Sequence, residues 1–375
     1  MAKDFIVAIE LGSSKITGIA GKKNPDGSIT VLAVAKEDSK ACMRKGVVYN
    51  IDKTAQALTN IINKLKGSLQ TDIARVYVGV GGQSLKGVKN VVVKDLPADS
   101  IVTQDIVNEL MDTNRNMKNN DYEVLDAITQ EYKVDMQDEL DPVGVQASHI
   151  EGNFLNLLWR KTFNRSLNKC FDNAGIPIAE MYVTPLAMAE EILTEAEKRA
   201  GCMLVDLGAD TTTVAIYTRD ILRHLFVLPL GSNNITKDLT TLKMEEREAE
   251  AMKLKYASAY TEVADIDDSM VWAIDNNRSV NSRLFIDVVE ARVLEIIANV
   301  WYLVPTEYTD KLLGGIILTG GGSNLKNIDD AFRRHTHIDK VRIAKFLPLN
   351  ILPETAKISI PHDGTMNGVI SILLK

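Results

Sequence analysis

The sequence predicts an α/β protein of two lobes, because one structural half occurs twice along the chain. A hairpin pattern at residues 9–19 returns at residues 205–215. Each copy has an apolar run, an acid, an apolar residue, a glycine, a small polar turn and a second apolar strand. The length of 375 residues also exceeds what one hydrophobic core usually serves. Together, the repeat and the length indicate two duplicated halves in one fold.

The composition is that of an ordinary globular protein. Hydrophobic residues make up 45% and charged residues 25% of the chain, as in soluble domains, and no apolar stretch approaches the ~20 residues of a membrane span. The three cysteines, Cys42, Cys170 and Cys202, lie far apart and are expected to be reduced thiols. The net charge is −7 and no basic run carries interleaved aromatics, so no nucleic-acid partner is expected.

The duplicated hairpins predict a clamp for phosphate groups. Gly12 and Gly208 are expected to adopt positive φ and to let a ligand approach the backbone closely, so that several N–H groups converge on an anion. Hydroxyl groups and the charge of Lys15 would add to this site. The predicted phosphate ligands are Gly12, Ser13, Ser14, Lys15, Gly208, Ala209, Asp210, Thr211 and Thr212.

Glu10 and Asp206 occupy equivalent places just before the two turns. Two carboxylates that face bound phosphates would repel them unless a hard cation lay between. Mg²⁺ held largely through water meets that requirement. By contrast, His335 and His337 lack further ligands at metal-binding spacing and are expected to form a polar surface turn.

A third glycine cluster lies at residues 314–325. It predicts a buried strand that ends in a triple glycine, followed by a helix capped by Ser323 or Asn324. A surface without side chains suits the close approach of an adenine or an α-phosphate. Other nucleotide motifs are missing, because the chain has no GxxxxGK[ST] and residues 78–84 lack the last glycine of GxGxxG.

Two acid-glycine hairpins followed by the turn TGGGSNL at residues 319–325 resemble the superfamily of actin, sugar kinases and heat-shock chaperone ATPases. The resemblance narrows to the FtsA family of bacterial cell division proteins. The segments that carry it span nearly the whole chain: residues 10–16, 76–82, 131–135, 141–144, 228–239 and 249–256. It implies an actin-like (ribonuclease H-like) duplicated fold with a small α+β subdomain inserted in the first lobe.

The resemblance also implies where the parts of the chain belong. The expected divisions are 1–84 and 161–200 for the first-lobe core, joined by 361–375; 85–160 for the insertion; 201–242 and 301–360 for the second-lobe core; and 243–300 for its outer helical subdomain. Helices are expected at about 52–65 and 162–174. A short apolar helix within 364–375 is expected to cross between the lobes.

ATP with Mg²⁺ is the cofactor that the resemblance implies. Residues 249–256 resemble the family's helix whose Glu and Lys reach the ribose and adenine. Glu250 and Lys253 share one helix face at i and i+3, and a carboxylate there can accept hydrogen bonds from ribose hydroxyls. The predicted adenosine ligands are Gly231, Ser232, Asn233, Glu250, Lys253, Gly320, Gly321, Gly322 and Asn324.

The function that the resemblance implies is that of an ATP-binding adaptor. It would polymerise at the inner face of the cytoplasmic membrane, at the division septum, and hold FtsZ there by the C-terminal tail of FtsZ. The tail would bind the outer second-lobe subdomain, in the region of the helix that contains Arg292 and Glu295. Residues 85–160 would serve filament contacts and other division proteins.

Two features depart from the family pattern. The family normally has Asp where this chain has Glu10; the extra methylene shifts the carboxylate, and Mg²⁺ demands near-ideal geometry. We therefore expect ATP binding with at most weak hydrolysis. Residues 369–374 are too short and too uniformly apolar for an amphipathic membrane helix. The expectation is a truncated chain whose membrane helix is not included.

Two alternatives stay open at this point. One is a pilus-assembly adaptor similar to PilM, which shares the insertion. The other is a small-molecule kinase of the same superfamily, in which Asp210 would be the base for the acceptor hydroxyl. A chaperone is not expected, because no substrate-binding domain follows the ATPase pattern.

Overall fold

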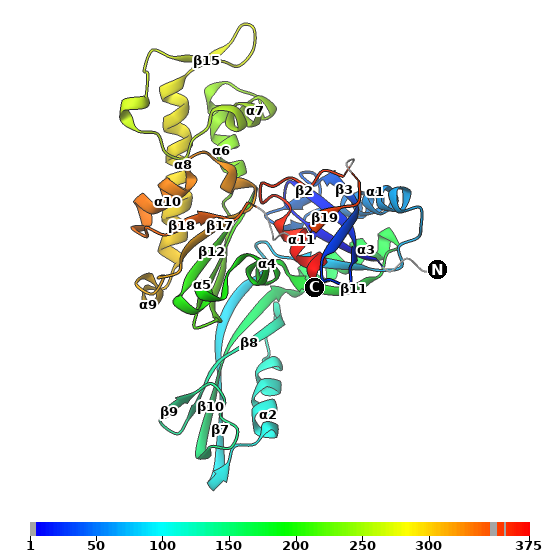
Figure 1. The fold of residues 1–375 in the computed structure, drawn as a ribbon, viewed down its shortest axis with the longest axis vertical. Helices are drawn as coiled ribbons and strands as arrows, with labels where there is room; N and C mark the ends of the chain where they lie inside the picture. Colours follow the sequence, from blue (N-terminus) through cyan, green and yellow to red (C-terminus); the bar gives the residue numbers. More distant parts are fainter. Residues whose placement is uncertain (1–4, 346–350, 356–357) are drawn as a thin grey trace.

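The computed structural model describes residues 5–345, 351–355 and 358–375 and contains two lobes, each built on one mixed sheet (Figure 1). The first-lobe sheet has the order β11-β6-β1-β2-β3-β19 and the second-lobe sheet the order β14-β13-β12-β17-β18. The first comprises β1 (Ile6–Leu11), β2 (Lys15–Lys23), β3 (Ile29–Asp38), β6 (Val76–Val80), β11 (Ile178–Val183) and β19 (Ile351–Pro353). The second comprises β12 (Cys202–Leu207), β13 (Thr212–Thr218), β14 (Ile221–Leu228), β17 (Gly315–Thr319) and β18 (Val341–Ile343).

The two sheets repeat one topology. In the first lobe β1, β2 and β3 form an antiparallel meander, and β6 and β11 then add in parallel on the other side of β1. In the second lobe β12, β13 and β14 form the same meander, and β17 and β18 add in parallel beside β12. Even the register agrees, since Glu10 pairs with Thr17 and Asp206 pairs with Thr213. The predicted duplicated α/β fold is confirmed.

Helices lie on the outside of each lobe. In the first lobe these are α1 (Ile51–Leu69) and α3 (Lys161–Ala174), and in the second lobe α6 (Ser232–Leu239), α7 (Glu246–Tyr256), α8 (Ser282–Leu303), α9 (Thr306–Thr309) and α10 (Ile328–Thr336). The helix expected at 52–65 is real but continues to Leu69, where Gln70 ends it in the left-handed conformation at φ 52°. In the part of the chain that the structure describes, no helix is long and apolar enough to cross a membrane.

Two further helices, α4 (Thr184–Ile192) and α11 (Asn367–Leu374), lie between the lobes (Figure 1). Helix α11 packs on β1 and β2 of the first lobe, α4 packs on β13 of the second, and the two helices pack on each other. The buried side chains of both sheets and both helices form one apolar cluster, which includes Ile19, Met188, Leu204 and Ile370. Burial of apolar surface at the back of the cleft therefore holds the lobes together.

The short apolar helix expected within 364–375 is α11, and its expected crossing between the lobes is confirmed only in part. Its body lies on the first-lobe sheet and does not itself cross. Its first residue, Asn367, connects the lobes, because its side-chain amide donates to Thr319 Oγ1 at 2.9 Å and to the Ala344 carbonyl at 3.0 Å in the second lobe.

The insertion is an antiparallel sheet with the order β7-β10-β8-β9. Its strands are β7 (Lys86–Ile101), β8 (Tyr122–Val134), β9 (Gln137–Glu139) and β10 (Gln146–Arg160), and helix α2 (Gln104–Arg115) packs on it. The insertion leaves the first lobe after β6 but also contacts the second lobe. There Lys89 Nζ lies 2.8 Å from Glu307 Oε1, and Gln130 Nε2 donates to the Leu222 carbonyl at 2.8 Å.

One expected boundary needs correction. Residues 301–360 were expected in the second lobe, but β19 pairs in parallel with β3 of the first-lobe sheet. The chain has therefore returned to the first lobe by residue 351. The outer subdomain at 243–300 is mostly helical, as expected, and between α7 and α8 it also has a 3₁₀ turn (Val263–Asp265) and a small hairpin of β15 (Val271–Ala273) and β16 (Ser279–Asn281). The remaining short elements are α5 (Glu195–Ala200), a 3₁₀ turn at Thr240–Leu242, and the strands β4 (Met43–Arg44) and β5 (Val47–Val48).

The apolar cluster between the lobes predicts a stability effect. Ile370→Ala removes a fully buried side chain from α11, and we expect it to lower the free energy of unfolding by about 2–5 kcal/mol. Leu294→Ala on α8 is the control, because Leu294 is 43% exposed and should cost about 0.5 kcal/mol or less. Urea unfolding followed by circular dichroism measures both. Equal losses in the two variants would contradict this account of how the lobes are joined.

Candidate functional site

The two hairpins close by the same backbone contact. The N–H of Gly12 donates to the Lys15 carbonyl at 3.1 Å, and the N–H of Gly208 donates to the Thr211 carbonyl at 2.9 Å. The expected positive φ is wrong for both glycines, since neither takes a left-handed conformation. They are needed for space instead: a Cβ on Gly12 would lie 2.7 Å from the Lys15 carbonyl oxygen, and one on Gly208 would lie 2.8 Å from that of Thr211.

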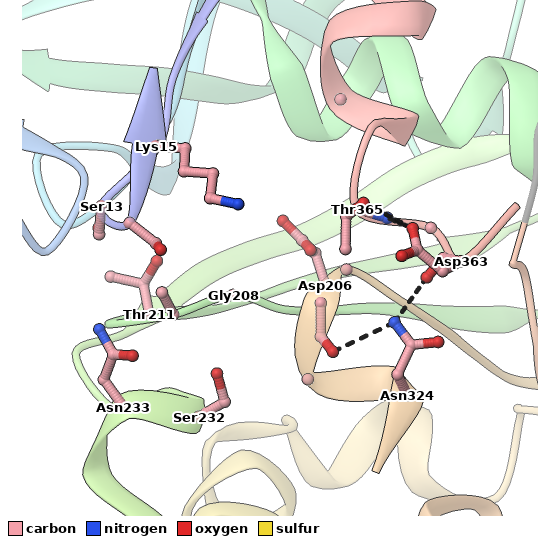
Figure 2. Close-up of a pocket in the computed structure, with 18 of the residues that line it drawn as sticks. Ser13, Lys15, Asp206, Gly208, Thr211, Ser232, Asn233, Asn324, Asp363 and Thr365 are labelled. Atoms are coloured by element: carbon pink, nitrogen blue, oxygen red, sulfur yellow. Dashed lines mark hydrogen bonds between the residues drawn. The ribbon is translucent and has the colours of Figure 1, made fainter. Parts of the chain in front are cut away.

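Both turns face one cleft of about 930 Å³ between the lobes (Figure 2). That volume is typical of small-molecule and cofactor sites. Most of the predicted site residues, which come from distant segments, meet there. Those that line it are Glu10, Gly12, Ser13, Ser14, Lys15, Asp206, Gly208, Ala209, Thr211, Ser232, Asn233, Glu250, Lys253, Gly320, Gly321, Gly322 and Asn324.

Three predicted residues lie behind this surface. The Thr212 hydroxyl is fully buried and donates to the Leu230 carbonyl at 2.9 Å, so the expectation that it faces phosphate is wrong. Asp210 accepts hydrogen bonds from Asn233 Nδ2 at 2.8 Å and from the Lys45 N–H at 3.3 Å. Gly231 packs against the backbone of the turn, where a Cβ would lie 2.5 Å from the Ala209 carbonyl oxygen. These residues shape the second turn.

The predicted adenosine pair is tied into the wall of the cleft. Lys253 is buried, and its Nζ lies 2.7 Å from Glu250 Oε2, 2.8 Å from Thr236 Oγ1 and 3.3 Å from the Ser232 carbonyl oxygen. Burial alone would raise the pKa of Glu250, but the hydrogen bonds from Lys253 and Thr236 hold it below its ordinary value. The Glu250 carboxylate is therefore charged and can accept hydrogen bonds from sugar hydroxyls.

The triple glycine forms a tight turn against the second hairpin. Gly320 has φ 83°, and a Cβ there would lie 2.2 Å from Asp206 Oδ1. The expected helix cap is wrong, because a 3₁₀ turn (Gly321–Asn324) follows and α10 begins only at Ile328, without a side-chain cap. Ser323 donates to the Gly320 carbonyl instead. Asn324 donates to the Asp363 carbonyl at 2.7 Å (Figure 2).

The two acids before the turns are part-buried and face the same cleft. Burial, followed by the charge of Asp206, raises the pKa of Glu10 to about 8, and burial raises the pKa of Asp206 to about 6. The Glu10 carboxylate accepts a hydrogen bond from the Val369 N–H. It also lies so close to the start of α11 that a Cβ on Gly368 would be 2.0 Å from Oε1. Its extra methylene thus directs the carboxylate toward this helix.

This donor set fits a magnesium ion held mainly by water. The described residues contain no group of three or more His, Cys, Asp or Glu side chains that could hold a metal directly. Burial raises the pKa of both carboxylates, and the charge of Asp206 raises that of Glu10 further, so a divalent cation between them would nevertheless stabilise the pair. Mg²⁺ usually keeps several waters and takes one or two carboxylates. Glu10 and Asp206 could supply that contact.

Sequence reasoning missed several residues that line the cleft, among them Thr17, Lys36, Asp363 and Thr365. Lys36 could have been found from the meander, since β3 pairs with β2 and places Lys36 opposite Thr17. Asp363 and Thr365 come from the segment before α11 and carry no motif. The Asp363 carboxylate accepts from the Thr365 N–H at 2.9 Å and from its hydroxyl (Figure 2).

The buried acids predict how stability depends on pH in the absence of ligand and metal. The pKa of Glu10 rises from 4.5 to about 8 on folding, so unfolding releases a proton between these values and the free energy of unfolding falls as pH rises through that window. Glu10→Gln should flatten the fall and make the protein more stable than wild type at pH 8, by about 1–3 kcal/mol.

Glu37→Gln, on β3 of the same sheet, is the matched control. Lys64 lowers the pKa of Glu37, so this carboxylate stabilises the fold at neutral pH and its removal should not flatten the profile. Chemical unfolding in EDTA from pH 5 to 8.5 measures all three proteins. If the Glu10→Gln profile runs parallel to wild type, the two acids do not titrate as described.

Comparisons with known proteins agree with this architecture. Residues 82–158 match the model of the SHS2 domain inserted in FtsA, and residues 203–360 match the model of the cell division protein FtsA. Among solved structures, the PilM-PilN type IV pilus biogenesis complex has a TM-score of 0.67 at 13% identity, over 98% of this chain and 97% of that one. MreB5 of Spiroplasma citri bound to ADP has a TM-score of 0.56 at 12% identity, over 99% and 95%. These likenesses show an actin-like fold.

One relative is similar enough in sequence to identify the family of this chain. The cell division protein FtsA of Porphyromonas gingivalis is 32% identical over 333 residues, which are 87% of this chain and 70% of the relative. With both family models matched in the expected order, the chain belongs to the FtsA family of cell division proteins.

Proposed function

We propose that the cleft binds ATP with Mg²⁺ and that the ATP-bound protein acts in cell division as a filament-forming adaptor for FtsZ. It would work at the inner face of the cytoplasmic membrane. The single observation that carries the nucleotide assignment is the duplicated pair of hairpins, which point Glu10 and Asp206 into one cavity. Membership of the FtsA family supports the role in division.

The lining of the cleft supports a phosphate end and an adenosine end. Ser13, Lys15 and Thr211 belong to the two turns and face the cavity between them (Figure 2). Backbone N–H groups, hydroxyls and an ammonium are the donors that phosphates take. Glu250 and Lys253, beside the glycine turn, form the other end and suit a ribose and a base. The neighbour MreB5 is described as bound to ADP.

ATP in this position would bridge the lobes, because each hairpin belongs to a different sheet. Mg²⁺ would supply the positive charge that lets phosphates approach Glu10 and Asp206. The two turns would then orient the phosphates, and α4 and α11 would form the apolar hinge behind them. Filling the cleft would thus favour one closed arrangement of the lobes.

The proposed site for the FtsZ tail is the outer surface of the second lobe around α8. Arg292 is fixed there by Asp238 of α6, with Nη2 3.0 Å from Oδ1, and it also contacts Glu295. Leu294, between them in sequence, is 43% exposed. A charged residue held in one rotamer beside an exposed leucine suits a short peptide with both apolar and charged groups. The insertion would serve filament contacts and other division proteins.

A PilM-like role in pilus assembly is the second candidate, and the likeness to the PilM-PilN complex supports it. That likeness has 13% identity and concerns the fold, whereas the relative at 32% identity is a division protein. A small-molecule kinase has less support, because the Asp210 carboxylate is engaged by Asn233 and by the Lys45 N–H.

Sedimentation with ATP and Mg²⁺, with and without an FtsZ tail peptide, tests the proposal in one assay. We expect ATP-dependent pelleting of the protein and co-pelleting of the peptide. A peptide from the N-terminal tail of a pilus-assembly protein is the control for the second candidate. Pelleting that ignores ATP, or retention of the pilus peptide alone, would contradict an FtsZ adaptor.

The position of Glu10 predicts slow hydrolysis. Glu10→Asp shortens the side chain and withdraws the carboxylate from α11, so that it can take the geometry Mg²⁺ requires. We expect slow Mg²⁺-dependent phosphate release from wild type and an increase of about tenfold or more in the variant, equivalent to about 1.4 kcal/mol of activation free energy. Glu37→Asp is the control. Brisk release from wild type that Glu10→Asp leaves unchanged would overturn this prediction.

A further inference from the structure

Lys36 faces the cleft because of its place on β3. Its neighbour Glu37 forms a salt bridge with Lys64 of α1, on the outer face of the sheet. Side chains alternate along a strand, so Lys36 points to the opposite face, where it lines the cavity as a half-buried residue.

The strand register places Lys36 in one row with the acid of the first hairpin. Glu10 on β1 pairs with Thr17 on β2, and Thr17 pairs with Lys36 on β3. Lys15, two residues before Thr17, is on the same face of the sheet and is the diagonal neighbour of Lys36. The floor of the cleft thus carries two adjacent ammonium groups, Lys15 and Lys36.

Among the described residues, neither the Lys15 nor the Lys36 ammonium has a counter-ion at contact distance. Across the described ranges 5–345, 351–355 and 358–375, no salt bridge or side-chain hydrogen bond is formed by Lys15 or Lys36. Burial, then the charge of Lys15, lowers the pKa of Lys36, while the charges of Asp363 and Glu10 oppose this. Lys15 is exposed and Lys36 is half-buried, so the charge of Lys36 beside a second cation is costly unless an anion lies between them.

The second half of the duplication shows that the sheet itself does not require Lys36. The equivalent row in the second lobe runs from Asp206 through Thr213 to Val227. The position that corresponds to Lys15 holds Thr211. The two cations therefore belong to the first lobe alone, and a valine fills the place of Lys36 in the same topology.

We infer that Lys36 is a second cationic ligand for the terminal phosphates of the nucleotide, beside Lys15. This rests on the proposed binding of ATP in the cleft. The terminal phosphates are the ones concerned, because Lys36 shares the row of Glu10 while the adenosine end lies at Glu250 and Lys253. Lys36 would thereby favour nucleotides with more phosphates.

Calorimetric titration with ATP, ADP and AMP in Mg²⁺ tests this with three variants. Lys36→Met removes the charge, Lys36→Arg keeps it, and Lys53→Met removes an exposed lysine from α1, outside the cleft. We expect Lys36→Met to weaken ATP binding by about ten- to a hundredfold, the usual range for a lost charge-assisted hydrogen bond. AMP should bind as before, Lys36→Arg should recover most of the affinity, and Lys53→Met should match wild type.

Several outcomes would overturn the inference. If Lys36→Met binds ATP as tightly as Lys53→Met does, Lys36 is not a phosphate ligand, although the cleft still binds ATP. If AMP affinity falls as much as ATP affinity, or the melting temperature drops, the role of Lys36 is structural. If wild type binds none of the three nucleotides, the proposed function itself fails and this inference fails with it.

Discussion

The molecule is organised around the approach of two carboxylates, Glu10 and Asp206, where its two halves meet. Each acid ends the central strand of its sheet, and each is crowded by a residue without a side chain, Gly368 beside Glu10 and Gly320 beside Asp206. Burial and mutual repulsion make this pair unfavourable when both groups are charged. The proposed binding of Mg²⁺ with ATP would relieve this repulsion, because a cation stabilises both charged carboxylates.

The forces that hold the lobes together differ between the back and the front of the cleft. At the back, α4 and α11 merge the two sheets into one apolar cluster, which favours a fixed hinge. At the front, the contacts are polar and exposed, such as the salt bridge of Lys40 with Glu246 and the Lys45 N–H on Asp210. Exposed ion pairs contribute little, so these contacts hold the lobes together less strongly than the apolar cluster does. The insertion adds further polar contacts to the second lobe.

Much of the site could be predicted because its parts are local. Each hairpin is a continuous segment whose acid, glycine and turn follow one another, and a second copy identifies the pattern. The sequence could not predict in the same way the residues that reach the site through pairing between strands or through the return of the chain to the first lobe. Lys36 belongs to the site only through the register of β3, Asp363 only because the segment before α11 reaches the glycine turn, and β19 only through its pairing with β3. The positive φ expected for Gly12 and the helix cap expected from Ser323 were both wrong. Each was inferred from the residue type, whereas local packing decides the conformation at these positions.

The asymmetry between the halves explains why Glu10 is tolerated in the first hairpin. In the second lobe the paired residues across the three strands are Asp206, Thr213 and Val227, so a short acid lies at one end of the row and an apolar side chain at the other. In the first lobe it is Glu10, Thr17 and Lys36, a longer acid with a cation at the other end. The longer side chain moves its carboxylate toward the start of α11, where the hydrogen bond from the Val369 N–H offsets part of the burial that raises its pKa. Under the proposed binding of ATP, Lys15 and Lys36 would then meet the phosphates. The first lobe would thereby contribute positive charge for binding more than a metal position for catalysis, as the proposed role of the nucleotide in assembly requires.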